Sequence, residues 1–163
     1  MPADRTALFA RLQELGIASV TVEHAPTFTV EQSTGLRESL PGAHTKNLFL
    51  TDKEGLIVLV VAKDDTRVDL KLLAKQLGAG RLSFGKPDLL EAMLGVPAGS
   101  VTPLALINPS AMSITVVVDE ALMAFADVNC HPLENTATTR LATPDLIRFI
   151  QACGHEARIL ALG

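Results

Sequence analysis

The chain has 163 residues, of which 48% are hydrophobic and 20% are charged, and its formal net charge is −4 at pH 7. This length predicts one domain over residues 1–163 with a continuous core, and the composition excludes a disordered protein. No apolar run approaches the roughly 20 residues of a membrane span, and the N-terminus lacks the apolar centre of a signal peptide. We therefore expect a cytoplasmic protein that has no membrane partner.

The spacing of apolar residues predicts both helices and strands in the first half of the chain. Leu8, Leu12 and Leu15 recur at helical spacing, whereas apolar and polar residues alternate over residues 19–24. The elements expected here are a helix over 4–15, a strand over 19–24, a helix that begins near Thr29, and a β-hairpin over 45–64 that turns at residues 52–55.

The second half mixes the same two patterns without a regular βα alternation. The elements expected are a helix over 68–78, a short strand over 82–85, a helix over 86–95, strands over 104–107 and 113–119, a short helix over 120–123, a strand over 137–143 and a last helix that begins at Thr143-Pro144. This order predicts an α+β domain around a mixed or antiparallel sheet.

The cysteines and histidines lack the spacing of a metal or thiol site. Cys130 and Cys153 form no CxxC pair and are expected to be free, buried thiols. The four histidines show neither HxH nor HExxH spacing, so we expect no metal and no other cofactor. Cys130 and His131 are neighbours, and neighbours on a strand point to opposite faces, which disfavours a thiol–imidazole pair. The GxSxG, Walker and GxGxxG motifs are absent as well.

One segment of this acidic chain is basic. Residues 67–86 carry a local charge of +4. The charged residues are Arg67, Lys71, Lys75, Arg81 and Lys86, with Asp69 as the one acid. Such a segment suits an anionic partner that is bound at one place, although a solvated helix face has the same composition.

Three stretches have side chains or backbone suited to binding. Lys46 begins an apolar strand in "HTKNLFL", where a cation meets an anion or reaches solvent from the strand end. The polar segment "NCHPLENTATTRL", with His131 and Asn135, either orients a ligand or satisfies its own backbone in turns. The loop Gly99-Ser100-Val101-Thr102-Pro103 holds backbone N–H groups at a fixed angle, either for a turn or for a substrate carbonyl.

Together, "HTKNLFL", the G-x-x-x-P loop and "CHPLENTATTRL" resemble, in order and separation, the freestanding prolyl-tRNA editing proteins of the YbaK/aminoacyl-tRNA synthetase-associated domain family. The segment "VEHAPTFTVEQS" is similar too, and the resemblance runs from about Val20 to the end of the chain. It implies a mostly antiparallel, barrel-like sheet surrounded by helices. It also implies hydrolysis of alanine that has been mischarged on proline tRNA.

The resemblance implies a role for each stretch. The loop Gly99-Ser100-Val101-Thr102-Pro103 would stabilise the oxyanion, and Lys46 would lie near the terminal adenosine and the ester. A bound water and the ribose hydroxyl of the substrate would carry the attack. The residues expected to bind substrate are Phe28, Leu36, Asn47, Phe49, His131 and Asn135, with Val101 as a further candidate wall. The expected tRNA contacts are Lys71, Lys75, Arg81 and Lys86.

Two alternatives remain open at this point. The amino acid removed can be cysteine or another small residue, since the residues that wall the pocket decide this. The chain can also be a non-catalytic module that binds aminoacyl-tRNA, although Lys46 and the G-x-x-x-P loop count against that hypothesis. The partners expected are the acceptor end of aminoacyl-tRNA(Pro) and, transiently, prolyl-tRNA synthetase.

Overall fold

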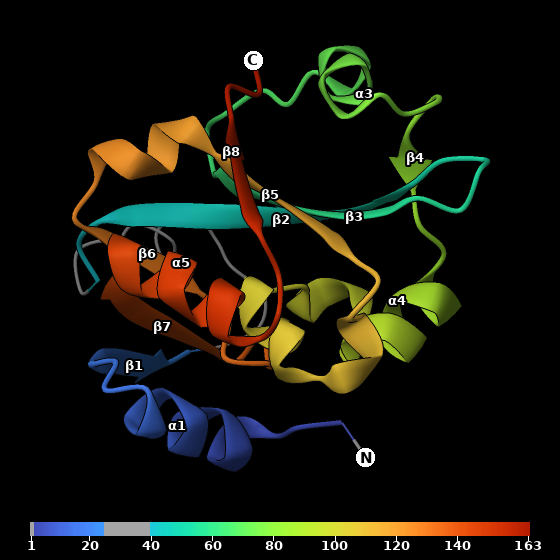
Figure 1. Cartoon of the computed structure of the whole chain (residues 1–163). Helices are drawn as coiled ribbons and strands as arrows, with labels where there is room; N and C mark the ends of the chain where they lie inside the picture. Colours follow the sequence, from blue (N-terminus) through green and yellow to red (C-terminus); the bar gives the residue numbers. More distant parts are fainter. Residues whose placement is uncertain (1, 25–39) are drawn as a thin grey trace.

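A computed structural model describes residues 2–24 and 40–163, and its framework is an eight-stranded sheet (Figure 1). The strands are β1 (Ser19–Glu23), β2 (Ala43–Thr51), β3 (Ile57–Lys63), β4 (Ser83–Phe84), β5 (Thr115–Asp119), β6 (Asp127–Cys130), β7 (Ala137–Ala142) and β8 (Ala157–Leu160). The α-helices are α1 (Arg5–Glu14), α3 (Leu70–Leu77), α4 (Pro87–Leu94) and α5 (Thr143–Ala152). The 3-10 helices are η1 (Ala98–Ser100), η2 (Pro103–Ile107), η3 (Pro109–Ala111) and η4 (Glu120–Ala124).

The sheet is mixed, in the order β1-β7-β6-β2-β3-β5-β8, and β4 pairs with β2 beside this path. Antiparallel pairs join β1 to β7, β6 to β7, β2 to β3 and β2 to β4. Parallel pairs join β2 to β6, β3 to β5 and β5 to β8. The α+β architecture with a mixed sheet, expected from the sequence, is therefore confirmed.

The two faces of the sheet bury two separate cores, because side chains alternate along β2 and β3. Phe49 and Val61 belong to the larger core, together with residues of α1, α4, α5 and η2. Leu50 and Val60 belong to the second core, which α3 covers. Figure 1 shows α3 on the side of the β2–β3 hairpin opposite to α4 and α5.

The helix signals in the sequence work as expected in α3. Asp69 caps the first turn by accepting hydrogen bonds from the N–H groups of Lys71 and Leu72. Gly78 ends the helix in the left-handed conformation, with φ of 65°. Among the described helices, none is both long and apolar enough to cross a membrane.

One expected strand is wrong. Residues 104–107 form most of η2 instead, because Pro103 begins a 3-10 turn and the Thr102 hydroxyl accepts a hydrogen bond from the Leu104 N–H at 3.3 Å. Leu104 and Ala105 are fully buried. A short apolar run that is buried on all sides has no period that would separate a strand from a helical turn. The helix expected near Thr29 lies outside the described residues.

Candidate active site

The site begins at a gap along one edge of β2. On this edge β2 pairs with β6 only at Ala43 and His44, and with β4 only at Leu50 and Thr51. The Phe49 carbonyl accepts from the Gly85 N–H at 2.9 Å, so the peptide groups of odd-numbered residues face this edge. Within the described ranges, the backbone of Asn47 therefore faces a stretch of edge that has no neighbouring strand.

The side chain of Asn47 carries an unused acceptor. It is half-buried on the same face of the sheet as Phe49. Its Oδ1 atom is buried and has no hydrogen-bond partner in the described part of the chain. Because a buried acceptor without a donor typically costs about 1–3 kcal/mol, such an atom is suited to a donor brought by a ligand.

The loop from Gly99 to Pro103 forms two successive 3-10 turns on this face. The Ser100 N–H is engaged, since it donates to the Pro97 carbonyl at 2.9 Å. The N–H groups of Gly99 and Thr102 have no partner among the residues that the structure describes. Val101 packs against the larger core and Pro103 is buried at the start of η2. The N–H groups of Gly99 and Thr102 are thus among the loop donors that remain available in the described structure.

The loop lies against the polar segment predicted to bind substrate. A Cβ atom built on Gly99 would lie 3.3 Å from Nδ2 of Asn135. Gly99 is not among the glycines with a positive φ, so its backbone conformation is open to any residue. The close approach of the Asn135 amide, and not a left-handed conformation, is therefore what disfavours a larger side chain at this position.

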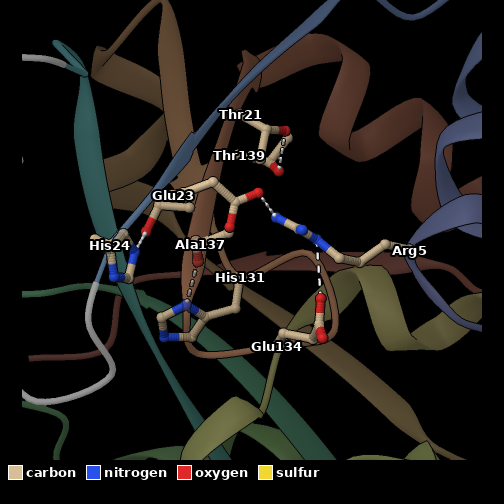
Figure 2. A network of polar contacts seen from close by, with 9 residues as sticks. Arg5, Thr21, Glu23, His24, His131, Glu134, Ala137 and Thr139 are labelled. Atoms are coloured by element: carbon tan, nitrogen blue, oxygen red, sulfur yellow. Dashed lines mark hydrogen bonds and ion pairs between the residues drawn. The ribbon is translucent and has the colours of Figure 1, made fainter.

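His131 lies at the start of the same polar segment with a fixed tautomer. Its Nδ1 lies 3.1 Å from the Ala137 carbonyl, which can only accept, so Nδ1 carries the proton (Figure 2). Burial lowers the pKa of His131, and the nearby His24, 6.5 Å away between ring centroids, lowers it further against the effect of the Ala137 carbonyl. At neutral pH the ring is therefore uncharged and Nε2 is an acceptor.

The lowered pKa of His131 predicts how activity depends on pH. Protonation of Nε2 removes the acceptor, so the rate should stay constant in the neutral range and fall only below the usual histidine value of about 6.5. Because the folded state favours the neutral ring, stability should also be lost as pH falls from that value toward the lowered pKa. A pH–rate profile checks this, and a fall centred at or above about 6.5 would contradict it.

Lys46 lies on the other face of β2. It pairs with Ala62 in the register of β2 and β3, and alternation places it on the side of Leu48 and Leu50, beneath which the second core lies. Its side chain is half-buried and forms no ion pair within residues 2–24 and 40–163. The structure thus places Lys46 beside Asn47 in the chain but not on the face that holds the Gly99 loop.

The basic side chains gather on the face that Lys46 shares. Lys71, Lys75 and Arg81 line a pocket of about 840 Å³ between α3 and the segment that follows it. Leu70, Ala74 and Leu82 form the apolar part of its lining. Lys86 lies apart from this pocket and precedes α4 as its N-terminal cap.

Of the other residues predicted to line the substrate pocket, one lies in the core and two lie outside the residues that the structure describes. Phe49 is buried, and a Cβ on Gly85 would clash with its ring, so Gly85 lies flat on Phe49. Phe28 and Leu36 lie outside the described residues. Thr138 belongs to the polar segment that the sequence analysis quotes, and its hydroxyl lies 2.7 Å from Nε2 of His24, a contact that the sequence did not predict. No sequence signal links these two residues, because their pairing follows from the register of β1 and β7.

Neither thiol is suited to nucleophilic chemistry. Burial raises the pKa of Cys130 to about 12 and that of Cys153 to about 11. Both are free, and no group of three or more potential metal ligands lies among the described residues.

We therefore expect hydrolysis to survive both EDTA and the double substitution Cys130→Ala, Cys153→Ala. Initial rates with and without chelator, and for the double variant, check this. A loss on chelation that zinc restores would show that the site needs a metal.

Comparison with known families places residues 24–149, which include β2, the Gly99 loop and the His131 segment, in the aminoacyl-tRNA editing domain. The chain belongs to this family. The aminoacyl-tRNA editing domains are proofreading hydrolases with the YbaK fold, so the family resemblance seen in the sequence is confirmed.

Relatives of the editing domain cover nearly the whole chain. The prolyl-tRNA editing protein ProX of Acetoanaerobium sticklandii is 34% identical over 97% of this chain and 97% of its own. The prolyl-tRNA synthetase associated domain-containing protein 1 of Danio rerio is 37% identical over 98% of this chain and 89% of its own. A crystal structure described as a candidate trans-editing enzyme for prolyl-tRNA synthetase has a TM-score of 0.74 at 19% identity, covering 98% and 97%, which shows the fold.

Proposed function

We propose that this editing domain acts in trans and hydrolyses the ester of alanine mischarged on proline tRNA. The observation that carries the proposal is the contact of the Gly99 loop with Asn135, because this contact holds the loop against the His131 segment. The N–H groups of Gly99 and Thr102 in this loop have no partner among the described residues. The relative named for prolyl-tRNA editing, ProX, supports the choice of tRNA.

The proposed chemistry uses positioned donors and acceptors. Water attacks the ester carbon, and the N–H groups of Gly99 and Thr102 stabilise the negative charge that develops on the carbonyl oxygen. Nε2 of His131 accepts a hydrogen bond from the water or from the neighbouring ribose hydroxyl. The ribose oxygen leaves with a proton, so free alanine and intact tRNA are the products.

Asn47 supplies the contact that identifies an aminoacyl group. Its buried Oδ1 has no partner in the described part of the chain, and the α-ammonium of the substrate is a donor of the required kind. A charged donor strengthens such a bond to about 1.5–3 kcal/mol. This contact binds any amino acid, so discrimination against proline must come from the size of the side-chain pocket.

A panel of mischarged tRNAs tests the proposed substrate. We expect rapid release of alanine from tRNA(Pro), slower release of cysteine and little release of proline. Faster release of cysteine than of alanine would identify a deacylase for the other small amino acid. Tight binding of all three without release would identify a non-catalytic module.

The basic pocket is the proposed binding site for tRNA phosphates. Lys71, Lys75 and Arg81 line it, and Lys46 lies on the same face of the sheet, so the acceptor strand would cross this face before its end enters the gap beside Asn47. Lys86 would contact the tRNA outside the pocket. Prolyl-tRNA synthetase remains a proposed transient partner, which would deliver the mischarged tRNA.

We expect Lys75→Glu and Arg81→Glu each to weaken tRNA binding. The slope of log K against log salt concentration should become less steep by about one unit in each variant, as for one lost phosphate contact. Lys53→Glu in the β2–β3 turn is the control, because it changes the net charge equally at an exposed position. Binding titrations at several salt concentrations measure the slope. Equal slopes for all three variants would place the tRNA elsewhere.

A further inference from the structure

Arg5, the first residue of α1, contacts two carboxylates from distant parts of the chain. Its Nη2 lies 2.6 Å from Oε1 of Glu23, the last residue of β1, and its Nε lies 2.9 Å from Oε2 of Glu134. Glu134 belongs to the segment that joins β6 to β7. Figure 2 shows Arg5 between the two glutamates, beside the His131 segment.

The segment that Arg5 contacts has a strained backbone. Leu133 has φ of 72°, and it is the one described residue other than glycine with a positive φ. A leucine in this region costs free energy, so the surrounding structure must hold it there. The Leu133 side chain is buried in the larger core, which fixes the segment from the inside. The Arg5–Glu134 ion pair, in which Nε makes no hydrogen bond with the carboxylate, holds it from the outside.

Both ends of this segment carry side chains of the candidate site. His131 begins it, and Asn135, which meets Gly99, directly follows Glu134. Glu23 lies opposite Ala137 in the register of β1 and β7, and the Ala137 carbonyl is the partner of the His131 ring. Arg5 therefore ties α1 to both the residue before Asn135 and the strand pair that orients His131.

We propose that Arg5 is a positioning residue, which through Glu134 and Glu23 holds the segment 131–135 in the conformation that presents His131 and Asn135 to the Gly99 loop. The proposal rests on the proposed function, since it assigns a role within that site. Exposed ion pairs contribute little to global stability, and Glu134 is half-exposed, so the effect concerns the geometry of the segment more than the stability of the fold.

Glu134→Ala tests the proposal without disturbing the core. We expect kcat for the aminoacyl ester to fall about fivefold or more, with KM within about twofold of wild type. This loss is smaller than the roughly 100-fold loss that a 1 Å misplacement can cause. The melting temperature should be unchanged. Arg11→Ala is the matched control, because it breaks an exposed ion pair with Glu14 on the same helix and should leave kcat unchanged.

The pKa of His131, followed by NMR in the same variants, separates positioning from simple electrostatics. Removal of the Glu134 charge by itself would lower the pKa of His131, whereas release of the segment exposes the ring and raises its pKa. A higher pKa together with a lower kcat supports the proposal. An unchanged or lower pKa, or a wild-type kcat, would overturn it. If wild type itself releases no amino acid, the proposed function fails, while the pKa measurement still decides whether Arg5 and Glu134 position the segment.

Discussion

Gly99→Val should lower the single-turnover rate of deacylation by about 10²–10³-fold, the loss typical of one oxyanion donor. The branched side chain would meet the Asn135 amide, which a Cβ atom already approaches to 3.3 Å. Either the loop or the Asn135 segment must then move, which displaces the Gly99 and Thr102 N–H groups that we propose as donors to the carbonyl oxygen. Because Gly99 is exposed and needs no left-handed φ, the variant should fold.

Two smaller substitutions complete this test. Gly99→Ala requires a shift of only a few tenths of an ångström and should reduce the rate much less than valine does. Ser100→Ala should be mild, because the backbone N–H of Ser100 already donates to Pro97 and its side chain has no role in the proposed chemistry. Rates measured beside melting temperatures decide the outcome. A lower melting temperature for Gly99→Val with an unchanged rate would show that Gly99 only forms a turn and has no role in the reaction. Loss of turnover in a folded Ser100→Ala variant would indicate a serine nucleophile.

Lys46→Ala should reduce kcat/KM at least about tenfold, the scale of a lost charge-assisted hydrogen bond of roughly 1.5–3 kcal/mol. Its side chain lies on the face of the basic pocket, so we expect the loss to come mainly from binding of the acceptor end. The fold should persist, because Lys46 forms no ion pair in the described part of the chain. Lys53→Ala, which removes an exposed lysine from the same hairpin, should have no effect. Full activity of a folded Lys46→Ala variant would contradict the role.

Local patterns predicted most of the fold. The hairpin of β2 and β3 follows from two apolar runs around a turn, and α3 and α4 follow from helical spacing with glycine at each C-terminus. The alternation of side chains along a strand also predicts that Lys46, Leu48 and Leu50 share one face, as the structure has them. The prediction of a strand over 104–107 was wrong because a run that is buried on all sides has no periodicity. A proline and a threonine cap determine its conformation instead.

The site was predictable only in part. The family resemblance named the stretches, but not their relation in space: alternation places Lys46 and Asn47 on opposite faces, and the approach of Asn135 to Gly99 depends on long-range packing. The engaged N–H of Ser100 follows from a 3-10 turn that no sequence signal marks. The contacts of Arg5 join a helix, a strand end and a loop, which only the assembled sheet brings together.

The proposed activity is tested most directly by a single-turnover reaction of the purified protein with Ala-tRNA(Pro) and, in parallel, with Pro-tRNA(Pro). The measured quantity is the rate at which the amino acid is released, compared with spontaneous hydrolysis of each ester. We expect rapid release of alanine and release of proline close to the spontaneous rate. Binding of Ala-tRNA(Pro) without faster release of alanine, or equal release of both amino acids, would contradict the proposed activity.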